Sequence, residues 1–203
     1  MTDSNKTATA ATPLATATEY FASLQAVLAH VDLNVIDQIT QAIWQNYEQG
    51  GTLYIFGNGG SAALASHLAC DFGKGTVTAG RQRFRTISLS DNVPLMTALA
   101  NDLAYEDIFS EQLADLAKKG DAVLAISGSG NSPNVVKGLE MARKMGLRTL
   151  GVTGYSGGRV KPLSDLCFVV PSDNMQHIED IHLAATHAIF RAIRHRMAQS
   201  LPR

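Results

Sequence analysis

The stretch Leu53-Tyr54-Ile55-Phe56-Gly57-Asn58-Gly59-Gly60-Ser61 decides the fold, because an apolar run leads directly into a glycine-rich turn. A second stretch repeats this layout, with Ala122 to Ile126 leading into Ser127-Gly128-Ser129-Gly130-Asn131-Ser132. Each stretch predicts a strand, a tight turn and a helix, and such a turn points backbone N–H groups at an anion. We call residues 57–61 the first loop and residues 127–132 the second loop. Together they predict one phosphorylated ligand held from two sides.

The rest of the chain alternates between strand-like and helix-like segments. Apolar runs predict strands at 52–56, 86–89, 122–126, 148–152 and 166–170. Apolar positions at helical spacing predict helices at 18–30, 32–48, 61–72, 93–100, 105–118, 133–145 and 176–198. This alternation indicates an α/β fold, in which helices cover both faces of a parallel sheet. We expect residues 1–17 to form a mobile tail and residues 18–203 to form one domain, since no linker or repeat divides them.

Charge and composition exclude several classes of partner. A net charge of -1 gives no electrostatic case for nucleic acid or for an acidic membrane surface. No segment approaches the roughly 20 apolar residues of a membrane span. Cys70 and Cys167 lie far apart in apolar stretches, so we expect reduced, buried thiols. Such thiols are typical of a protein in the reducing cytoplasm.

Both loops also have a purely structural interpretation. A glycine-rich turn after a strand is often only a tight connection, and neither loop has the spacing of the nucleotide-binding fingerprints. The second loop favours a ligand, because it offers hydroxyls at Ser127, Ser129 and Ser132 beside the amide of Asn131. Hydroxyls and backbone N–H groups at a helix start can bind a phosphate monoester, and the helix dipole supplies the positive potential.

Two further pairs of residues are candidates for chemistry. His67 and Asp71 are four residues apart on a predicted helix and share one face. Glu179 and His187 lie eight residues apart on the last helix, which separates them by about 80° around its axis. Two imidazoles and two carboxylates fit a zinc site. Spacing alone favours a structural interpretation, with a solvated acid on each helix and two half-buried histidines.

Other polar residues have less specific positions. Asp91 and Asn92 follow the second strand and either face a sugar or cap the helix that begins near Val93. We expect His182 to pack in the interior, and His177 and His195 to lie on the surface.

The ordered set of motifs resembles the sugar isomerase (SIS) superfamily, and most closely its phosphoheptose isomerases, over residues 18 to 195. The motifs are the first loop with Ala62-Ala63, Asn101-Asp102, the second loop, Thr153-Gly154 with Gly157-Gly158, and Ile178-Glu179-Asp180-Ile181-His182. The resemblance implies a flavodoxin-like three-layer sandwich with a five-stranded parallel sheet. It also implies an N-terminal helical pair used in oligomerisation, and a homotetramer with active sites at subunit interfaces.

The resemblance also implies roles for single residues. Asp71 and His187 match catalytic positions, and one zinc per subunit would be held at His67, Asp71, Glu179 and His187. The implied substrate-binding residues are Asn58, Gly59, Gly60, Ser61, Asn101, Asp102, Ser127, Gly128, Ser129, Ser132 and Glu179. Two matches are inexact, because the family usually has Glu, its assigned catalytic base, at Asp71 and Gln at Glu179.

These residues predict a cytoplasmic aldose-ketose isomerase that acts on a sugar phosphate. The leading reaction converts sedoheptulose 7-phosphate to D-glycero-D-manno-heptose 7-phosphate through an enediol. Asp71 would remove a proton next to the carbonyl, and His187 would donate or shuttle one. The alternative is a non-catalytic SIS-domain regulator that binds a sugar phosphate or a protein such as a replication initiator. The retained His67 and His187 favour the enzyme, whereas the altered Asp71 and Glu179 favour the regulator.

Overall fold

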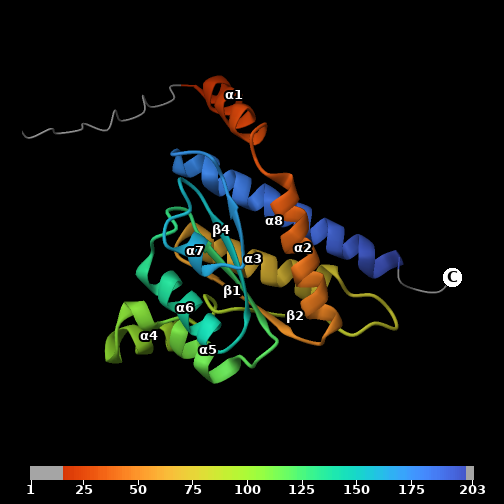
Figure 1. Cartoon of the computed structure of the whole chain (residues 1–203), viewed down its shortest axis with the longest axis vertical. Coiled ribbons are helices and arrows are strands. Elements are labelled where there is room, and N and C mark those ends of the chain that lie inside the picture. The colour runs from red at the N-terminus through yellow and green to blue at the C-terminus, as the bar shows by residue number, and fades with distance from the viewer. Residues whose placement is uncertain (1–15, 200–203) are drawn as a thin grey trace, which may run out of the picture.

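A single parallel sheet organises the protein, whose computed structural model describes residues 16–199 (Figure 1). The sheet has the order β2-β1-β3-β4-β5 and every pairing is parallel. The strands are β1 (Thr52–Gly57), β2 (Arg85–Ser88), β3 (Ala122–Ser127), β4 (Arg148–Thr153) and β5 (Leu166–Val169). This is the flavodoxin-like strand order, and the direction of winding changes between β1 and β3. Ligands of such sheets bind outside the carboxyl ends of the strands at this point, where both loops begin.

Helices cover both faces of the sheet, which confirms the predicted three layers (Figure 1). One face packs against α2 (Leu33–Glu48), α3 (Gly60–Gly75) and α8 (Met175–Gln199). The other face packs against α4 (Val93–Asp102), α5 (Ser110–Leu116), α6 (Pro133–Lys144) and α7 (Val160–Leu163). Strands β1 and β3 are almost wholly buried between the two layers, which explains their continuous apolar sequence.

The sequence pattern misses two local features. The helix predicted at 105–118 is divided into a 3-10 turn, η1 (Tyr105–Asp107), and α5. The backbone carbonyl of Asp107 accepts a hydrogen bond from the Ser110 hydroxyl, and the Asp107 carboxylate pairs with Lys137 of α6. Helix α7 has four residues and is too short for a periodic pattern. The predicted tail lies outside the described residues, except for Thr16, which caps α1 (Ala17–Leu28), and Ala17.

Helix α1 lies on the start of α8, and none of its own residues is buried. The Tyr20 hydroxyl donates a hydrogen bond to Asp180 Oδ2 at 2.5 Å, and Ser23 Oγ lies 3.0 Å from His177 Nε2. These contacts cover His177, which is 4% exposed. The prediction of a surface position for His177 is therefore wrong, because its cover comes from a helix about 150 residues earlier in the chain.

The cysteines are only partly as predicted. Cys70 and Cys167 are both free, but Cys70 is exposed and Cys167 is partly buried. Helix α3 turns Leu68 and Phe72 into the core, so the residue midway between them points outward and the prediction of a buried Cys70 is wrong. Among residues 16–199, no helix is long and apolar enough to cross a membrane.

Candidate functional site

The two loops leave the carboxyl ends of the neighbouring strands β1 and β3. Gly59 precedes α3 with a φ of +55°, a left-handed conformation that favours glycine. Ser132 precedes α6 and is followed by Pro133 at the first helical position. No side chain caps the start of either helix. The positive ends of the two helix dipoles are therefore presented at the same edge of the sheet.

The second loop gathers its hydroxyls in one turn. Ser127 Oγ lies 3.3 Å from Ser132 Oγ and accepts a hydrogen bond from the Gly130 N–H at 3.2 Å. Ser129 Oγ accepts a hydrogen bond from the Asn131 N–H at 3.2 Å. The hydroxyls of Ser127 and Ser132 thus converge at the start of α6, in the arrangement that a phosphate monoester needs.

A pair of asparagine side chains joins the first loop to the first turn of α6, directly after the second loop. Asn58 of the first loop and Asn134 of α6 exchange amide hydrogen bonds in both directions, each at 2.8 Å. The Tyr105 hydroxyl also donates to Asn58 Oδ1 at 3.2 Å. Asn134 is 1% exposed and was not among the predicted site residues. The sequence could have indicated Asn134, because it is a polar residue at a position of the predicted helix where the apolar pattern expects a buried side chain.

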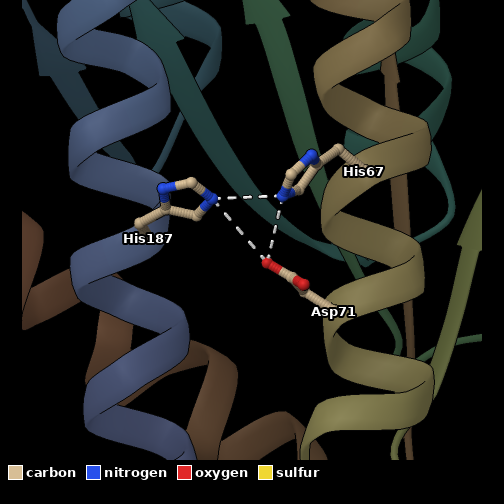
Figure 2. Close-up of side chains that lie close together, drawn as sticks. All are labelled: His67, Asp71 and His187. Carbon is tan, nitrogen blue, oxygen red and sulfur yellow. Dashed lines mark hydrogen bonds and ion pairs between the residues drawn. The ribbon is translucent and has the colours of Figure 1, made fainter.

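His67, Asp71 and His187 form a compact cluster between α3 and α8 (Figure 2). The two imidazole Nε2 atoms lie 3.1 Å apart. Asp71 Oδ2 lies 3.3 Å from His67 Nε2 and 3.9 Å from His187 Nε2. All three side chains are partly exposed, at 50%, 27% and 42% for His67, Asp71 and His187. Solvent and small molecules can therefore reach the cluster.

The geometry of this cluster fits a zinc ion. Four ligands at zinc distances around a tetrahedron lie about 3.3–3.6 Å from one another. The separations of 3.1, 3.3 and 3.9 Å bracket that range. Among the described residues, these three supply ligand atoms that all lie within 4.8 Å of one another. Three protein ligands and one open position are typical of a catalytic zinc site.

Glu179 lies apart from this cluster, beside the first loop. Its Oε1 atom is 3.0 Å from the position that a Cβ would occupy on Gly60, so the glycine leaves room for the carboxylate in this position. Glu179, Gly60, Ser61, His67 and His182 all line one cavity of about 290 Å³. The group of three ligands does not include Glu179, and its predicted roles toward zinc and substrate stay predictions.

His182 is buried beneath this cavity, as the sequence predicts. It is 1% exposed, and burial lowers its pKa from 6.5 to about 4 despite an opposing hydrogen bond to the Thr153 backbone. Its Nε2 atom has no hydrogen-bond partner among the described residues. His182 is therefore neutral at physiological pH.

The remaining predicted residues take different places. Asn92 caps α4, because its side chain accepts a hydrogen bond from the Leu95 N–H at 3.2 Å. Asp91 accepts hydrogen bonds from the hydroxyls of Ser66 and of Ser88. Asn101 and Asp102 are exposed in the last turn of α4, where they bond to each other at 2.8 Å. The structure thus supports the capping interpretation for Asn92.

Comparison with known proteins places these features in context. The family model described as SIS domain matches residues 19–154. The chain is 40% identical over 163 residues to a probable phosphoheptose isomerase of Thermoplasma volcanium. The aligned region covers 80% of this chain and 83% of that protein.

Two solved structures share the whole fold. A phosphoheptose isomerase from Neisseria gonorrhoeae aligns with a TM-score of 0.81 and 26% identity, over 87% of this chain and 95% of that one. A phosphoheptose isomerase from Francisella tularensis aligns with a TM-score of 0.83 and 28% identity, over 88% and 96% of the two chains. The similarity therefore extends over nearly nine tenths of this chain.

Proposed function

The chain belongs to the SIS domain family and, within it, to the phosphoheptose isomerases, and from that membership we propose how its own residues isomerise a sugar phosphate. The substrate that we propose is sedoheptulose 7-phosphate, and the product is D-glycero-D-manno-heptose 7-phosphate. The observation that carries the proposal is the cluster of His67, Asp71 and His187 beside two loops built for an anion.

The two loops bind the phosphate group in this proposal. The hydroxyls of Ser127 and Ser132 donate hydrogen bonds to phosphate oxygens, and the starts of α3 and α6 supply positive potential. The Asn58–Asn134 pair holds the loops at a fixed separation. The phosphate then anchors one end of the open-chain sugar, and the other end extends toward the cluster between α3 and α8.

Asp71 and His187 move the protons. The cluster contacts use Asp71 Oδ2, so the other carboxylate oxygen can take the proton from the carbon next to the carbonyl. The electron pair of that C–H bond forms the C=C bond of the enediol, and His187 protonates the former carbonyl oxygen. Return of a proton to the neighbouring carbon, with loss of the hydroxyl proton, completes the exchange of aldose and ketose.

Zinc fits this site, with His67, Asp71 and His187 as its ligands and Glu179 as the predicted fourth. When bound, it would polarise the oxygens of the reacting carbons. His187 Nε2 is the atom that this histidine presents to the cluster, 3.9 Å from Asp71 Oδ2, so it is both the predicted zinc ligand and the predicted proton donor. Ligation and proton donation by that atom exclude one another, so adding zinc distinguishes the two roles.

We also propose a homotetramer located in the cytoplasm. Phe21 of α1 and Leu33 at the start of α2 are each 66% exposed, which favours a subunit interface over the N-terminal helices. Asn101 and Asp102 are exposed at the end of α4, where a neighbouring subunit can use them. The free cysteines fit a reducing compartment.

Proton exchange with solvent tests the reaction directly. The protein is incubated with sedoheptulose 7-phosphate in D₂O, and NMR follows deuterium entering at the carbon next to the carbonyl. We expect exchange well above the rate without protein, because an enediol must form and reprotonate. The measurement is repeated after EDTA treatment and after adding zinc. Binding without exchange under every condition would contradict the isomerase and favour the regulatory alternative.

A further inference from the structure

A second groove continues beyond the cluster along α8. It has a volume of about 790 Å³, with His67, Asp71 and His187 at one end and Arg191, Arg194 and His195 at the other. Asp71 is the one carboxylate among its lining residues, against two guanidinium groups. The far end of this groove is therefore electropositive.

The arginines lie on the same stripe of α8 as the cluster histidine. Arg191 is four residues after His187 and Arg194 is seven residues after it, which are the positions that repeat on one helix face. At 1.5 Å per residue, Arg191 and Arg194 lie about 6 and 10 Å beyond His187 along the axis. Glu179, beside the first loop, lies about 12 Å before His187 on the same helix. Loop, cluster and arginines thus follow one another along α8.

Neither arginine is paired with an acidic side chain in the described part of the chain. Among residues 16–199, Arg191 and Arg194 make no salt bridge, whereas Arg148 and Arg159 both pair with acids. Arg191 and Arg194 are three residues apart, a spacing at which like charges repel and weaken a helix. A groove that gathers unpaired cations beside a reactive cluster fits a ligand with negative charge.

We infer that the Arg191–Arg194 end of this groove is a second anion subsite, which gives the protein a preference for phosphosugars with a carboxylate at the end remote from the phosphate. The inference rests on the proposed function, because it places the phosphate in the two loops and the carbonyl end at the cluster. An aldonic acid phosphate has a carboxylate where the aldose has its aldehyde. It cannot form the enediol of the reaction, so such compounds bind as competitive inhibitors.

Two six-carbon probes isolate the effect of the carboxylate. 6-Phosphogluconate and sorbitol 6-phosphate have the same chain length and phosphate, and they differ in having a carboxylate or a hydroxymethyl group at C1. We expect calorimetry to give roughly tenfold tighter binding of 6-phosphogluconate at low salt, the scale of a charge-assisted contact that solvent partly screens. The difference should shrink as ionic strength rises.

Variants identify the groups responsible. Arg191→Gln combined with Arg194→Gln should remove the preference and leave the binding of sorbitol 6-phosphate unchanged. Lys144→Gln, which removes one charge from an exposed position at the far end of α6, should keep the preference. All titrations are run on the protein as purified and after EDTA treatment, because a carboxylate can also bind a metal.

Each other outcome overturns the inference in a distinct way. A preference that survives in the double arginine variant but disappears with EDTA places the carboxylate on a metal. A double variant with a changed mass by light scattering identifies the groove as a contact between subunits. Equal binding of the two probes rejects the subsite and leaves the proposed isomerase intact. Failure of both probes to bind rejects the phosphate loops and the subsite together.

Discussion

In the proposed reaction, Asp71 is the residue on which the chemistry depends most directly. Its carboxylate is one methylene shorter than the glutamate of the family that the sequence resembles, yet Oδ2 still lies 3.3 Å from His67 Nε2. The helices α3 and α8 are therefore close enough for the shorter side chain to join the cluster. Whether it also reaches the substrate carbon depends on about 1 Å of placement, to which catalysis is sensitive.

Replacing Asp71 tests its role as the base. Asp71→Asn should lower turnover roughly 10²-fold or more while keeping the fold and the affinity for sugar phosphate, because only proton removal is lost. Asp71→Glu should keep the activity or raise it. Steady-state kinetics and calorimetry on the same preparations measure both effects. Equal turnover by wild type and Asp71→Asn would show that another group removes the proton.

His182 gives the fold a defined dependence on pH. Its pKa is about 4 in the native state and 6.5 in the unfolded chain, so the unfolded chain binds the extra proton between these values. The free energy of unfolding should therefore fall as pH decreases from 6.5 to 4, by up to about 3 kcal/mol. Urea denaturation at a series of pH values measures this loss.

Two variants assign that loss to His182. His182→Asn keeps a donor near the Thr153 backbone but has no proton to gain, so its stability should fall less over the same range. His195→Asn, at an exposed position, should follow the wild type. The comparison uses slopes against pH and is independent of any constant loss from repacking. Identical slopes for wild type and His182→Asn would contradict the assignment.

Among the structural elements, the second loop departs most clearly from ordinary helix capping. Ser132 occupies the position before α6 but makes no capping bond, and its hydroxyl faces Ser127 instead. A serine at that position ordinarily stabilises the helix start. Here that contribution is absent, and in the proposed function the hydroxyl binds the phosphate.

Removing the two hydroxyls tests the phosphate assignment. Sedoheptulose 7-phosphate should raise the melting temperature of the wild type, because it binds the native state alone. Ser127→Ala combined with Ser132→Ala should abolish that increase. Ser110→Ala is the matched control, since its buried hydroxyl bonds to the Asp107 carbonyl, outside both loops. An equal increase with unphosphorylated sedoheptulose would mean that the loops do not recognise phosphate.

The elements could largely be predicted from the sequence, because burial on both faces forces the continuous apolar strands that define them. Local patterns likewise predict the two loops, as glycine-rich turns after strands. They also identify the three cluster residues, His67, Asp71 and His187, as candidates by their positions on predicted helices. Three features depend on contacts between segments that are distant in the sequence. These are the burial of His177 under α1, the Asn58–Asn134 pair and the separation of Glu179 from the cluster. The sequence around each residue does not indicate which distant residue it will contact.

At the scale of the whole molecule, α1 is the part least explained by one chain. None of its residues is buried, and Phe21 and Leu28 are 66% and 42% exposed. The polar contacts of Tyr20 and Ser23 and the packing of Leu24 and Val27 against the core join this helix to the rest of the chain, and a helix of twelve residues is marginal in water on its own. In the proposed tetramer, a second copy covering these side chains would supply the missing apolar burial.

Light scattering at micromolar concentration tests this assembly. We expect a tetramer for the wild type and smaller species for Phe21→Asp, because each buried phenylalanine contributes about 2–3 kcal/mol. Leu116→Asp changes a 49% exposed leucine at the end of α5 and should stay tetrameric. A monomeric wild type would contradict both the proposed interface and the proposed sharing of active sites between subunits.

The parallel course of α3 and α8 has a consequence for the choice of sugar. Gly60 meets Glu179 at one end of the pair and His67 meets His187 two turns later, so the distance from loop to cluster is set by rigid helices. A phosphosugar reacts only when its phosphate and its carbonyl carbon reach both places at once. In the proposed function the helices therefore fix the spacing between the phosphate loops and the cluster, and we expect pentose phosphates, two carbons shorter than the heptulose, to exchange deuterium more slowly.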